Sequence, residues 1–171
     1  SSAKTKFSFQ VPNSQSTDLG GIKTLIETGN TNLLANPSFE ASTVDSGWGH
    51  SILSVADETS IVHGGKQSAK LTFSTLGSFA QDLTPTSNTL SQNMEFSCWV
   101  NTTMTTLELK AREDGNTVGT PVVIPATGIW QQVVVNYPGP ANGTSVGVQV
   151  DAASSAAGTA YIEACYVGPA L

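Results

Sequence analysis

The stretch TLELKAR, residues 106–112, alternates strictly between apolar and polar side chains. Leu107, Leu109 and Ala111 point to one side of an extended chain, and the charged residues between them point to the other. The same period of two continues in SAKLTFS (68–74), WQQVVVNY (130–137) and TSVGVQVD (144–151). Strands that are half buried and half solvated in this way are typical of antiparallel sheets.

Turn signals separate these alternating runs. HGG (63–65), EDGN (113–116) and PGPANG (138–143) supply residues that suit chain reversals, and prolines at 85, 121, 125, 138 and 140 fall between the runs. No segment of ten or more residues has the 3.6-residue period of an amphipathic helix. The sequence therefore predicts an all-β fold, an antiparallel β-sandwich of roughly eight to ten short strands.

The composition limits the classes of partner. Asp, Glu, Lys and Arg make up 12% of the chain, and the formal net charge is −6. Nucleic-acid binding needs clustered basic residues, whereas the seven here are scattered, so we expect no nucleic-acid partner. No apolar run approaches the roughly 18 residues of a membrane helix, so we expect no membrane-spanning segment. Because the chain begins with Ser1, we expect a fragment whose missing targeting signals say little about location.

Residues 1–30 differ from the rest of the chain. Their apolar side chains form one alternating patch and one short patch, at Phe7, Phe9 and Val11 and at Ile22, Leu25 and Ile26. These are too few to bury themselves, so we expect an extended shaft-like or linker segment at 1–30 and a globular domain at 31–171. One interpretation is a flexible leader on a monomer. The other is a strip that is stable only against copies of itself, which would make the protein a parallel homotrimer.

Cys98 and Cys165 are the two cysteines of the chain. They lack a C-x-x-C spacing, and with two histidines a zinc site is not expected. They could form one disulfide in an exported protein, or lie as two small buried apolar groups. The sequence leaves both alternatives open.

Two short patterns resemble catalytic motifs. GTSVG (143–147) matches G-x-S-x-G, but a nucleophile elbow needs a following helix, with the acid and the histidine later in the chain. Here Ser145 enters an alternating run, and both histidines precede it. GGK (64–66) lacks the spacing of a phosphate-binding loop. We therefore expect that the protein is not an enzyme.

Five segments resemble, in their order and spacing, the carbohydrate-binding jelly-roll modules of the galactose-binding-like superfamily, which open with N-L-x-x-N-P-x-F-E. The segments are NLLANPSFE (32–40), DSGW (45–48), HGGKQSAKL (63–71), WQQVVVNY (130–137) and AYIEACYVG (160–168). The resemblance covers residues 31–169 and implies a jelly-roll β-sandwich. The EACYVG ending and the Ser/Thr-rich style are most similar to modules of phage tail fibres and of trimeric adhesive fibres of predatory bacteria.

The residues themselves explain part of the opening motif. Asn36-Pro37 forces extended chain before it, Phe39 then fills the core, and Glu40 emerges beside it.

The resemblance also implies a structural calcium site. In calcium-binding members the motif's acid joins carbonyls of a Gly-rich loop and an acid on the last strand, which correspond here to Glu40, the His63–Lys66 loop and Glu163. Calcium takes six to eight oxygen ligands. This chain has Glu163 where Asp is usual and Ala164 in place of a second acid. The alternative is that Glu40 and Glu163 make hydrogen bonds or salt bridges at the rim of the sheet.

Aromatic faces can stack on sugar rings, but large aromatic side chains are first of all core material. The resemblance places Trp99 and Trp130 at framework positions, so we expect both to be buried. Trp48 follows a glycine in a loop and has His50 beside it, which makes both candidates for ligand binding. A sugar site also needs convergent polar groups. The outward strand positions expected to supply them are Gln81, Arg112 and Gln149.

We therefore expect a non-catalytic glycan-recognition (adhesin) domain of an extracellular trimeric fibre or a virion tail fibre, with a cell-surface glycan as its partner. A structural fibre or capsid-decoration domain without sugar binding is the alternative from another class. A third interpretation is a targeting module of a polysaccharide hydrolase.

Overall fold

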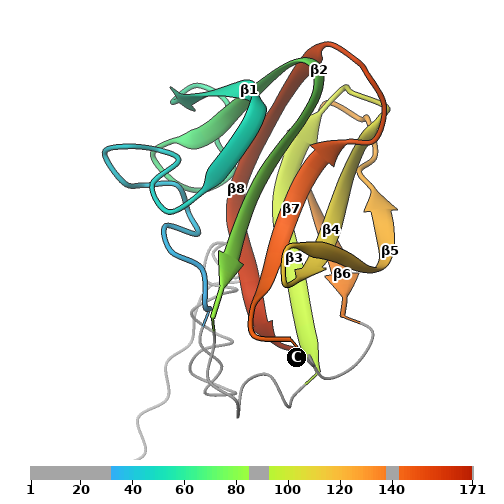
Figure 1. Cartoon of the computed structure of the whole chain (residues 1–171). Coiled ribbons are helices and arrows are strands. Elements are labelled where there is room, and N and C mark those ends of the chain that lie inside the picture. Colours follow the sequence, from blue (N-terminus) through green and yellow to red (C-terminus); the bar gives the residue numbers. More distant parts are fainter. Residues whose placement is uncertain (1–31, 85–92, 138–142, 171) are drawn as a thin grey trace, which may run out of the picture.

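The computed structural model describes residues 32–84, 93–137 and 143–170. In these ranges the chain forms strands and no helix, as the alternating pattern predicts (Figure 1). The strands are β1 (Gly49–Glu58), β2 (Ser68–Leu83), β3 (Met94–Thr102), β4 (Leu107–Glu113), β5 (Asn116–Val123), β6 (Gln131–Asn136), β7 (Val146–Ala152) and β8 (Gly158–Pro169). Within the described ranges no helix could cross a membrane. The shaft-like segment predicted at 1–30 lies outside them, so it and its boundary stay predictions.

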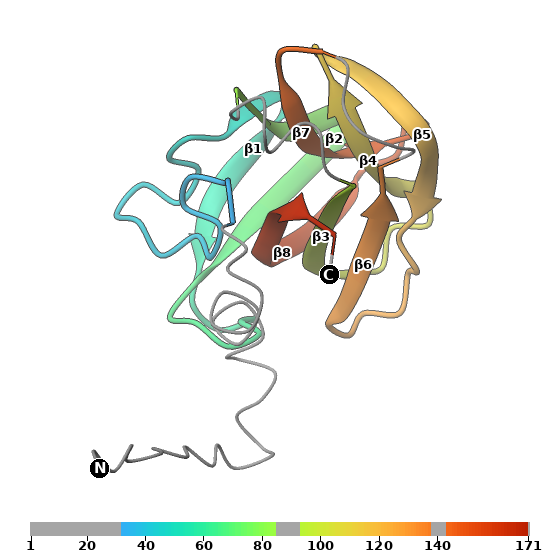
Figure 2. The ribbon, with the colours of Figure 1, turned by 90° about the horizontal axis from the view of Figure 1, so that it is seen from below.

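Hydrogen bonds join the strands into one antiparallel sheet that folds over on itself. The strand order is β5-β4-β7-β2-β8-β3-β6, and β1 pairs with β2 beside this path. The long strand β2 connects two layers, because its residues 69–73 pair with β8 and its residues 78–83 pair with β7. Figure 2 shows the β4–β7 layer (β5, β4, β7 and the end of β2) packed over the β3–β8 layer (the start of β2, β8, β3 and β6). This arrangement confirms the predicted jelly-roll β-sandwich.

The apolar side of each alternating run faces the space between the layers. Leu107, Leu109 and Ala111 of β4 have no exposed surface, and neither do Val146 and Val148 of β7. They belong to the same buried cluster as the apolar residues of β2, β3 and β8. Each of the leucine and valine side chains stabilises the fold by roughly 1.5–3 kcal/mol relative to an exposed one. The period of two therefore identified the core of these strands correctly.

One proline departs from the expected positions. Pro121 lies inside β5 rather than between strands. Strand β5 is at one end of the strand order, and Pro121 falls where the pairing of β5 with β4 is irregular, which is a position that tolerates a residue without an N–H.

The opening motif closes one end of the core. Phe39 has no exposed surface, and its ring centroid lies 5.1 Å from that of Trp48 and 6.0 Å from that of Phe79. Glu40, the next residue, is exposed. The structure thus confirms that Phe39 fills the core while Glu40 emerges beside it.

Asn36 shapes the turn that brings Phe39 inward. Its φ is 45°, in the left-handed region that Asn tolerates better than most residues, and not in the extended region expected for the residue before Pro37. Its side-chain amide donates to the Val44 carbonyl (2.8 Å), and its side-chain oxygen accepts from the Ala41 N–H (3.1 Å). Asn36 therefore contributes both a backbone conformation and two hydrogen bonds that an apolar residue could not supply.

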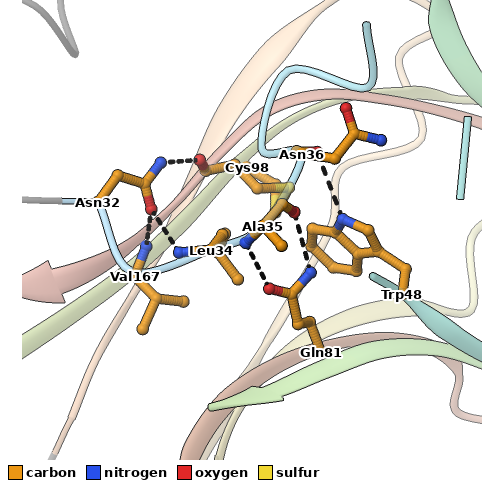
Figure 3. The surroundings of a disulfide bond; sticks show 9 residues. Asn32, Leu34, Ala35, Asn36, Trp48, Gln81, Cys98 and Val167 are labelled. Carbon is orange, nitrogen blue, oxygen red and sulfur yellow. Dashed lines mark hydrogen bonds between the residues drawn. A yellow bond between two sulfur atoms is a disulfide. The ribbon is translucent and has the colours of Figure 1, made fainter. Parts of the chain in front are cut away.

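Asn32 ties the same segment to β8 (Figure 3). Its oxygen accepts from the N–H groups of Leu34 (3.2 Å) and Val167 (3.1 Å), and its amide donates to the Cys165 carbonyl (2.8 Å). Cys165 forms a disulfide with Cys98 on the neighbouring strand β3, and both residues are buried. Of the two alternatives for the cysteines, the structure shows the disulfide.

Candidate functional site

A cleft of about 350 Å³ opens on the outward side of the β4–β7 layer, where β1 joins β2. Its floor consists of small residues, because Gly49 pairs with Ala80 and Ser51 with Ser78, and directly paired residues share one side of a sheet. The two serine hydroxyls lie 2.9 Å apart. The lining residues are Gly47, Gly49, His50, Ser51, Ser78, Ala80, Gln81, Asp82 and Arg112.

Arg112 forms one wall of the cleft. Its guanidinium lies 3.0 Å from the Asp82 carboxylate on β2 and donates to the side-chain oxygen of Gln149 on β7. To reach Asp82 from β4, Arg112 passes over Gly147, with which it is paired. A Cβ at position 147 would lie 2.4 Å from Asp82 Oδ1, so only glycine leaves room there. The structure therefore brings the predicted residues Arg112 and Gln149 together, with Asp82 as the third member.

A second charged group continues along the same side of the layer. Lys110 on β4 lies 2.9 Å from Asp151 on β7 and 3.4 Å from Glu108. Burial alone would lower the pKa of Lys110, but its bonds to Asp151 and Glu108 outweigh this and raise the pKa. With Arg112 and Asp82, this side presents two cations and three carboxylates, all held in ion pairs.

His50 borders the cleft, but it pairs with the inward residue Phe79, so its side chain lies on the opposite side of the β1–β2 pair from Gly49 and Ser51 of the floor. Its Nε2 lies 3.3 Å from Asp45 Oδ2, and 37% of its side chain is exposed. The Asp45 carboxylate therefore orients the imidazole, and a role of His50 in ligand binding stays a prediction.

Trp48 does not line the cleft, contrary to the expectation that it could stack on a ligand. It is 7% exposed and stacks on Phe79 with centroids 4.8 Å apart and rings nearly parallel. Its Nε1 donates to the Asn36 carbonyl (3.4 Å), as Figure 3 shows. Gly47 precedes it with φ of 83°, in the left-handed region, and this turn directs the indole into the core. Both faces of Trp48 are therefore core surface.

Gln81 was expected on an outward position, and the structure corrects this. It shares the phase of Phe79 along β2, so its side chain points inward and is 4% exposed. Its oxygen accepts from the Ala35 N–H (2.6 Å) and its amide donates to the Ala35 carbonyl (3.0 Å), as Figure 3 shows. Gln81 therefore positions the opening segment behind the cleft, with its oxygen and amide already paired.

The other two tryptophans lie on the far side of the sandwich. We expected Trp99 and Trp130 to be buried, but both are only partly buried, on the outward side of the β3–β8 layer. The His63 ring stacks on Trp99 at 3.9 Å and meets Trp130 edge-on at 5.8 Å. Trp99 alternates with the buried residues Cys98 and Val100, so the strand itself turns it outward.

The carboxylate of Glu163 meets the predicted calcium loop as a hydrogen-bond acceptor. Glu163 is 3% exposed, and it accepts from the N–H groups of His63 (2.6 Å), Gly64 (3.0 Å) and Gly65 (2.6 Å). This carboxylate therefore faces the amide side of the loop.

Glu40 meets the next two residues of the loop in the same way. It accepts from the N–H groups of Lys66 (2.6 Å) and Gln67 (3.4 Å). The side-chain amide of Gln67 donates in turn to the carbonyls of Phe39 (2.7 Å) and Ala41 (2.9 Å). The opening motif and the loop are thus joined by side chains from both.

This donor set does not fit a calcium ion. Calcium requires six to eight oxygen ligands, whereas N–H groups surround the two carboxylates here. Across the described ranges, no group of three or more His, Cys, Asp or Glu side chains could hold a metal. Calcium binding stays a prediction for titration to test.

The G-x-S-x-G pattern has a structural role. The N–H and hydroxyl of Ser145 donate to the Asp114 carboxylate (2.9 and 3.3 Å), as do those of Thr144 (2.9 and 3.1 Å). The histidines contact Asp45 and the tryptophan pair, so the structure does not bring a catalytic triad together at Ser145.

Sequence reasoning missed the floor of the cleft and Asp82. The floor depends on the register between β1 and β2, which is interrupted by a bulge at Ile52. Asp82 could have been found, because it alternates with Phe79 and Gln81 on β2 and so must point outward.

No protein-family model and no curated protein sequence matches this chain. Solved structures do match. A CBM61 module in complex with β-1,4-galactotriose has 16% identity and a TM-score of 0.58, covering 80% of this chain and 97% of that one. The CBM22-1 xylan-binding domain from Paenibacillus barcinonensis Xyn10C has 18% identity and a TM-score of 0.58, covering 83% and 97%. The enzymatically active domain of bacteriophage CBA120 tailspike protein 4 has 19% identity and a TM-score of 0.60, covering 80% of this chain but 21% of that one. The fold is that of jelly-roll carbohydrate-binding modules.

Proposed function

We propose that this chain is a non-catalytic carbohydrate-binding module that holds a glycan in the cleft between β1, β2 and β4. The observation that carries the proposal is a shallow floor of small residues surrounded by polar groups that are already fixed. Arg112 and Asp82 hold each other at 3.0 Å, so they can offer donors and acceptors to sugar hydroxyls with little loss of side-chain freedom. Two proteins of the same fold, named above with galactotriose and xylan, add support.

The charges beside the cleft favour a neutral glycan over an acidic one. Lys110 and Arg112 are each paired with a carboxylate, and the side of the sheet carries one more acid than cations. A uronate or sialate carboxylate would therefore approach a slightly negative surface. Hydroxyl groups can use both the donors and the acceptors of these pairs.

The carboxylates support a binding role rather than a hydrolytic one. Glycoside hydrolysis generally uses two carboxyl groups that flank the scissile bond. Asp82 is the one carboxylate among the residues that line the cleft, and Arg112 is paired with it. The cleft as described thus offers hydrogen bonds without a second acid opposite the first.

A glycan array with the whole chain, followed by titration of the best neutral oligosaccharide, tests the proposal. Arg112→Ala should weaken binding by about tenfold or more, since hydrogen bonds to charged groups contribute roughly 1.5–3 kcal/mol. The matched control is Lys70→Ala, which removes one cation from the outward side of the β3–β8 layer and should leave affinity unchanged. If the folded protein bound no glycan on the array, the result would favour the alternative of a structural fibre or capsid-decoration domain.

We also propose that the module is displayed on an extracellular trimeric fibre and that residues 1–30 hold three copies together. The buried disulfide suits an oxidising compartment, and one match in fold is a phage tailspike. Three weak sites on one tip would gain avidity when the target presents glycans at matching spacing. Light scattering should find a trimer for the whole chain and a monomer for one that starts at Thr31. A monomeric whole chain would rule out the fibre arrangement.

Two alternatives each have one supporting observation. The tailspike match shows that this fold occurs in a virion protein, which is the support for a structural fibre domain, and the xylan-binding domain is the support for a polysaccharide-targeting module. The array separates them, because the first predicts no glycan and the second predicts an insoluble or plant-type polysaccharide.

A further inference from the structure

We propose that hydrogen bonds from five consecutive backbone amides to two carboxylates lock residues 63–67 in place without a metal ion. The proposal concerns the side of the sandwich away from the cleft and does not depend on glycan binding. It follows from the direction of the peptide groups in the loop, the space around Gly65 and the segments that the lock joins.

The direction of the peptide groups excludes the loop carbonyls as ligands. In a planar trans peptide, the N–H of one residue points opposite to the carbonyl of the residue before it. Since the N–H groups of residues 63–67 all donate to Glu40 or Glu163, the carbonyls of residues 62–66 point away from these carboxylates. A calcium ion between the loop and the carboxylates would therefore face N–H groups instead of oxygens.

The available space leads to the same conclusion. A calcium ion lies about 2.3–2.6 Å from each of its oxygen ligands, so an ion between the loop and a carboxylate would need that distance on both sides. The amide nitrogens of His63, Gly65 and Lys66 lie only 2.6 Å from carboxylate oxygens, which leaves no room for an ion between them. A Cβ at Gly65 would fall 2.0 Å from an oxygen of Glu40 and 3.0 Å from one of Glu163. Both carboxylates thus press against the backbone of Gly65, and no gap of ionic size separates them from the loop.

Amide dipoles can take the place of a cation here. Glu163 is almost completely buried, and a buried carboxylate needs compensation by charge or by hydrogen bonds. Successive N–H groups form a concave site with a partial positive charge that holds anions. The side chain of Glu163 reaches this site directly and occupies both of its oxygens with amides.

The lock joins three segments that are distant in sequence. Glu40 is the last residue of the opening motif, the loop precedes β2, and Glu163 lies on β8. Through the loop, the lock also positions His63 on the face of Trp99. Hydrogen bonds within the chain therefore hold His63 in position against Trp99.

Hydrogen exchange of the whole, unmodified chain tests the proposal without any variant. Amides 63–67 should be protected in EDTA, and millimolar calcium should change neither their protection nor the melting temperature. Binding of calcium to the native state alone would raise the melting temperature with concentration. A melting temperature that rises with calcium, or protection that appears only with calcium, would overturn the proposal.

Substitutions then identify the groups that make the lock. Glu163→Gln keeps the side-chain shape but turns one acceptor into a donor that faces N–H groups, so protection at residues 63–65 should be lost in EDTA and in calcium alike. Glu40→Gln should affect residues 66–67 more than 63–65. Glu95→Gln on β3 is the control, because it removes a carboxylate from the same layer without touching the loop. Unchanged protection in Glu163→Gln would contradict the lock, and so would equal loss in the control.

Discussion

The two outward sides of this sandwich have opposite characters. The β4–β7 layer carries ion pairs and a floor of small residues, with Arg112 and Asp82 at its cleft. The β3–β8 layer carries the stacked rings of His63 and Trp99 beside a loop held by carboxylates. The surface aromatics and the cleft are therefore on different sides of the molecule. A glycan in the cleft would be recognised by hydrogen bonds to fixed polar groups, without an aromatic plate among the lining residues.

The largest expected effect separates the core behind the cleft, where Trp48 lies, from the outward side of the β3–β8 layer, where Trp130 lies. Trp48 should behave as core, so Trp48→Ala should lower the free energy of unfolding by about 3–5 kcal/mol. Trp130→Ala, on the outward side of the β3–β8 layer, should cost about 1 kcal/mol, because the side chain is only partly buried. Urea unfolding of both variants measures the contrast. Equal losses would mean that the two indoles have the same surroundings, contrary to the stacking of Trp48 on Phe79.

The disulfide belongs to the β3–β8 layer alone. It closes a stretch of 67 residues, and the chain-entropy model gives a stabilisation of about 4 kcal/mol for a loop of that size. We expect the Cys98→Ala/Cys165→Ala double variant to lose roughly 2–4 kcal/mol in chemical unfolding. Variant protein that still folds should retain the affinity of the cleft, which lies in the other layer. Loss of affinity in folded protein would show that the layers are coupled.

The smallest effects concern pH and have opposite signs in the two layers. In the β4–β7 layer, N–H groups of Ser145 and Thr144 lower the pKa of Asp114. Its contribution to stability is therefore complete above the unfolded-state pKa of about 3.9 and is lost as the pH falls through the lower folded value. The melting temperature of Asp114→Asn should lie below that of the parent at pH 6 and approach it in acid.

Glu95 in the β3–β8 layer should show the reverse. Burial raises the pKa of its carboxyl, so the folded state holds the proton more tightly than the unfolded state does. Ionised Glu95 thus costs stability above its folded pKa, and this cost disappears as the pH falls toward the unfolded value of about 4.3. Glu95→Gln should melt higher than the parent at neutral pH, with the difference shrinking in acid. Melting curves between about pH 3 and 7 compare both variants, and shifts of the same sign would contradict the assignment.

The sequence by itself determined the all-β class, the inward residues of each alternating run and the role of the opening motif. These follow from local rules: a strand alternates sides with every residue, and Asn36-Pro37 followed by Phe39 forms a turn that buries an aromatic ring. Arg112 and Gln149 were found because they alternate with buried neighbours. Gln81 is polar but occupies an inward position of β2, in phase with Phe79. Its polarity suggested an outward side chain, whereas the alternation along the strand correctly indicates an inward one.

Only the tertiary structure decided which of two outward sides each residue joins, because alternation separates inside from outside and carries no information about strand order. The order of strands brought Arg112 over Gly147 to Asp82 and put Trp99 on the opposite side of the sandwich. The disulfide also depends on strand order, because Cys98 and Cys165 meet only where β3 and β8 are neighbours in the sheet. Whether Glu163 meets loop carbonyls or loop amides depends on the rotation of a few peptide planes. Those rotations are set by contacts between segments nearly a hundred residues apart. A local sequence pattern contains no information about such contacts.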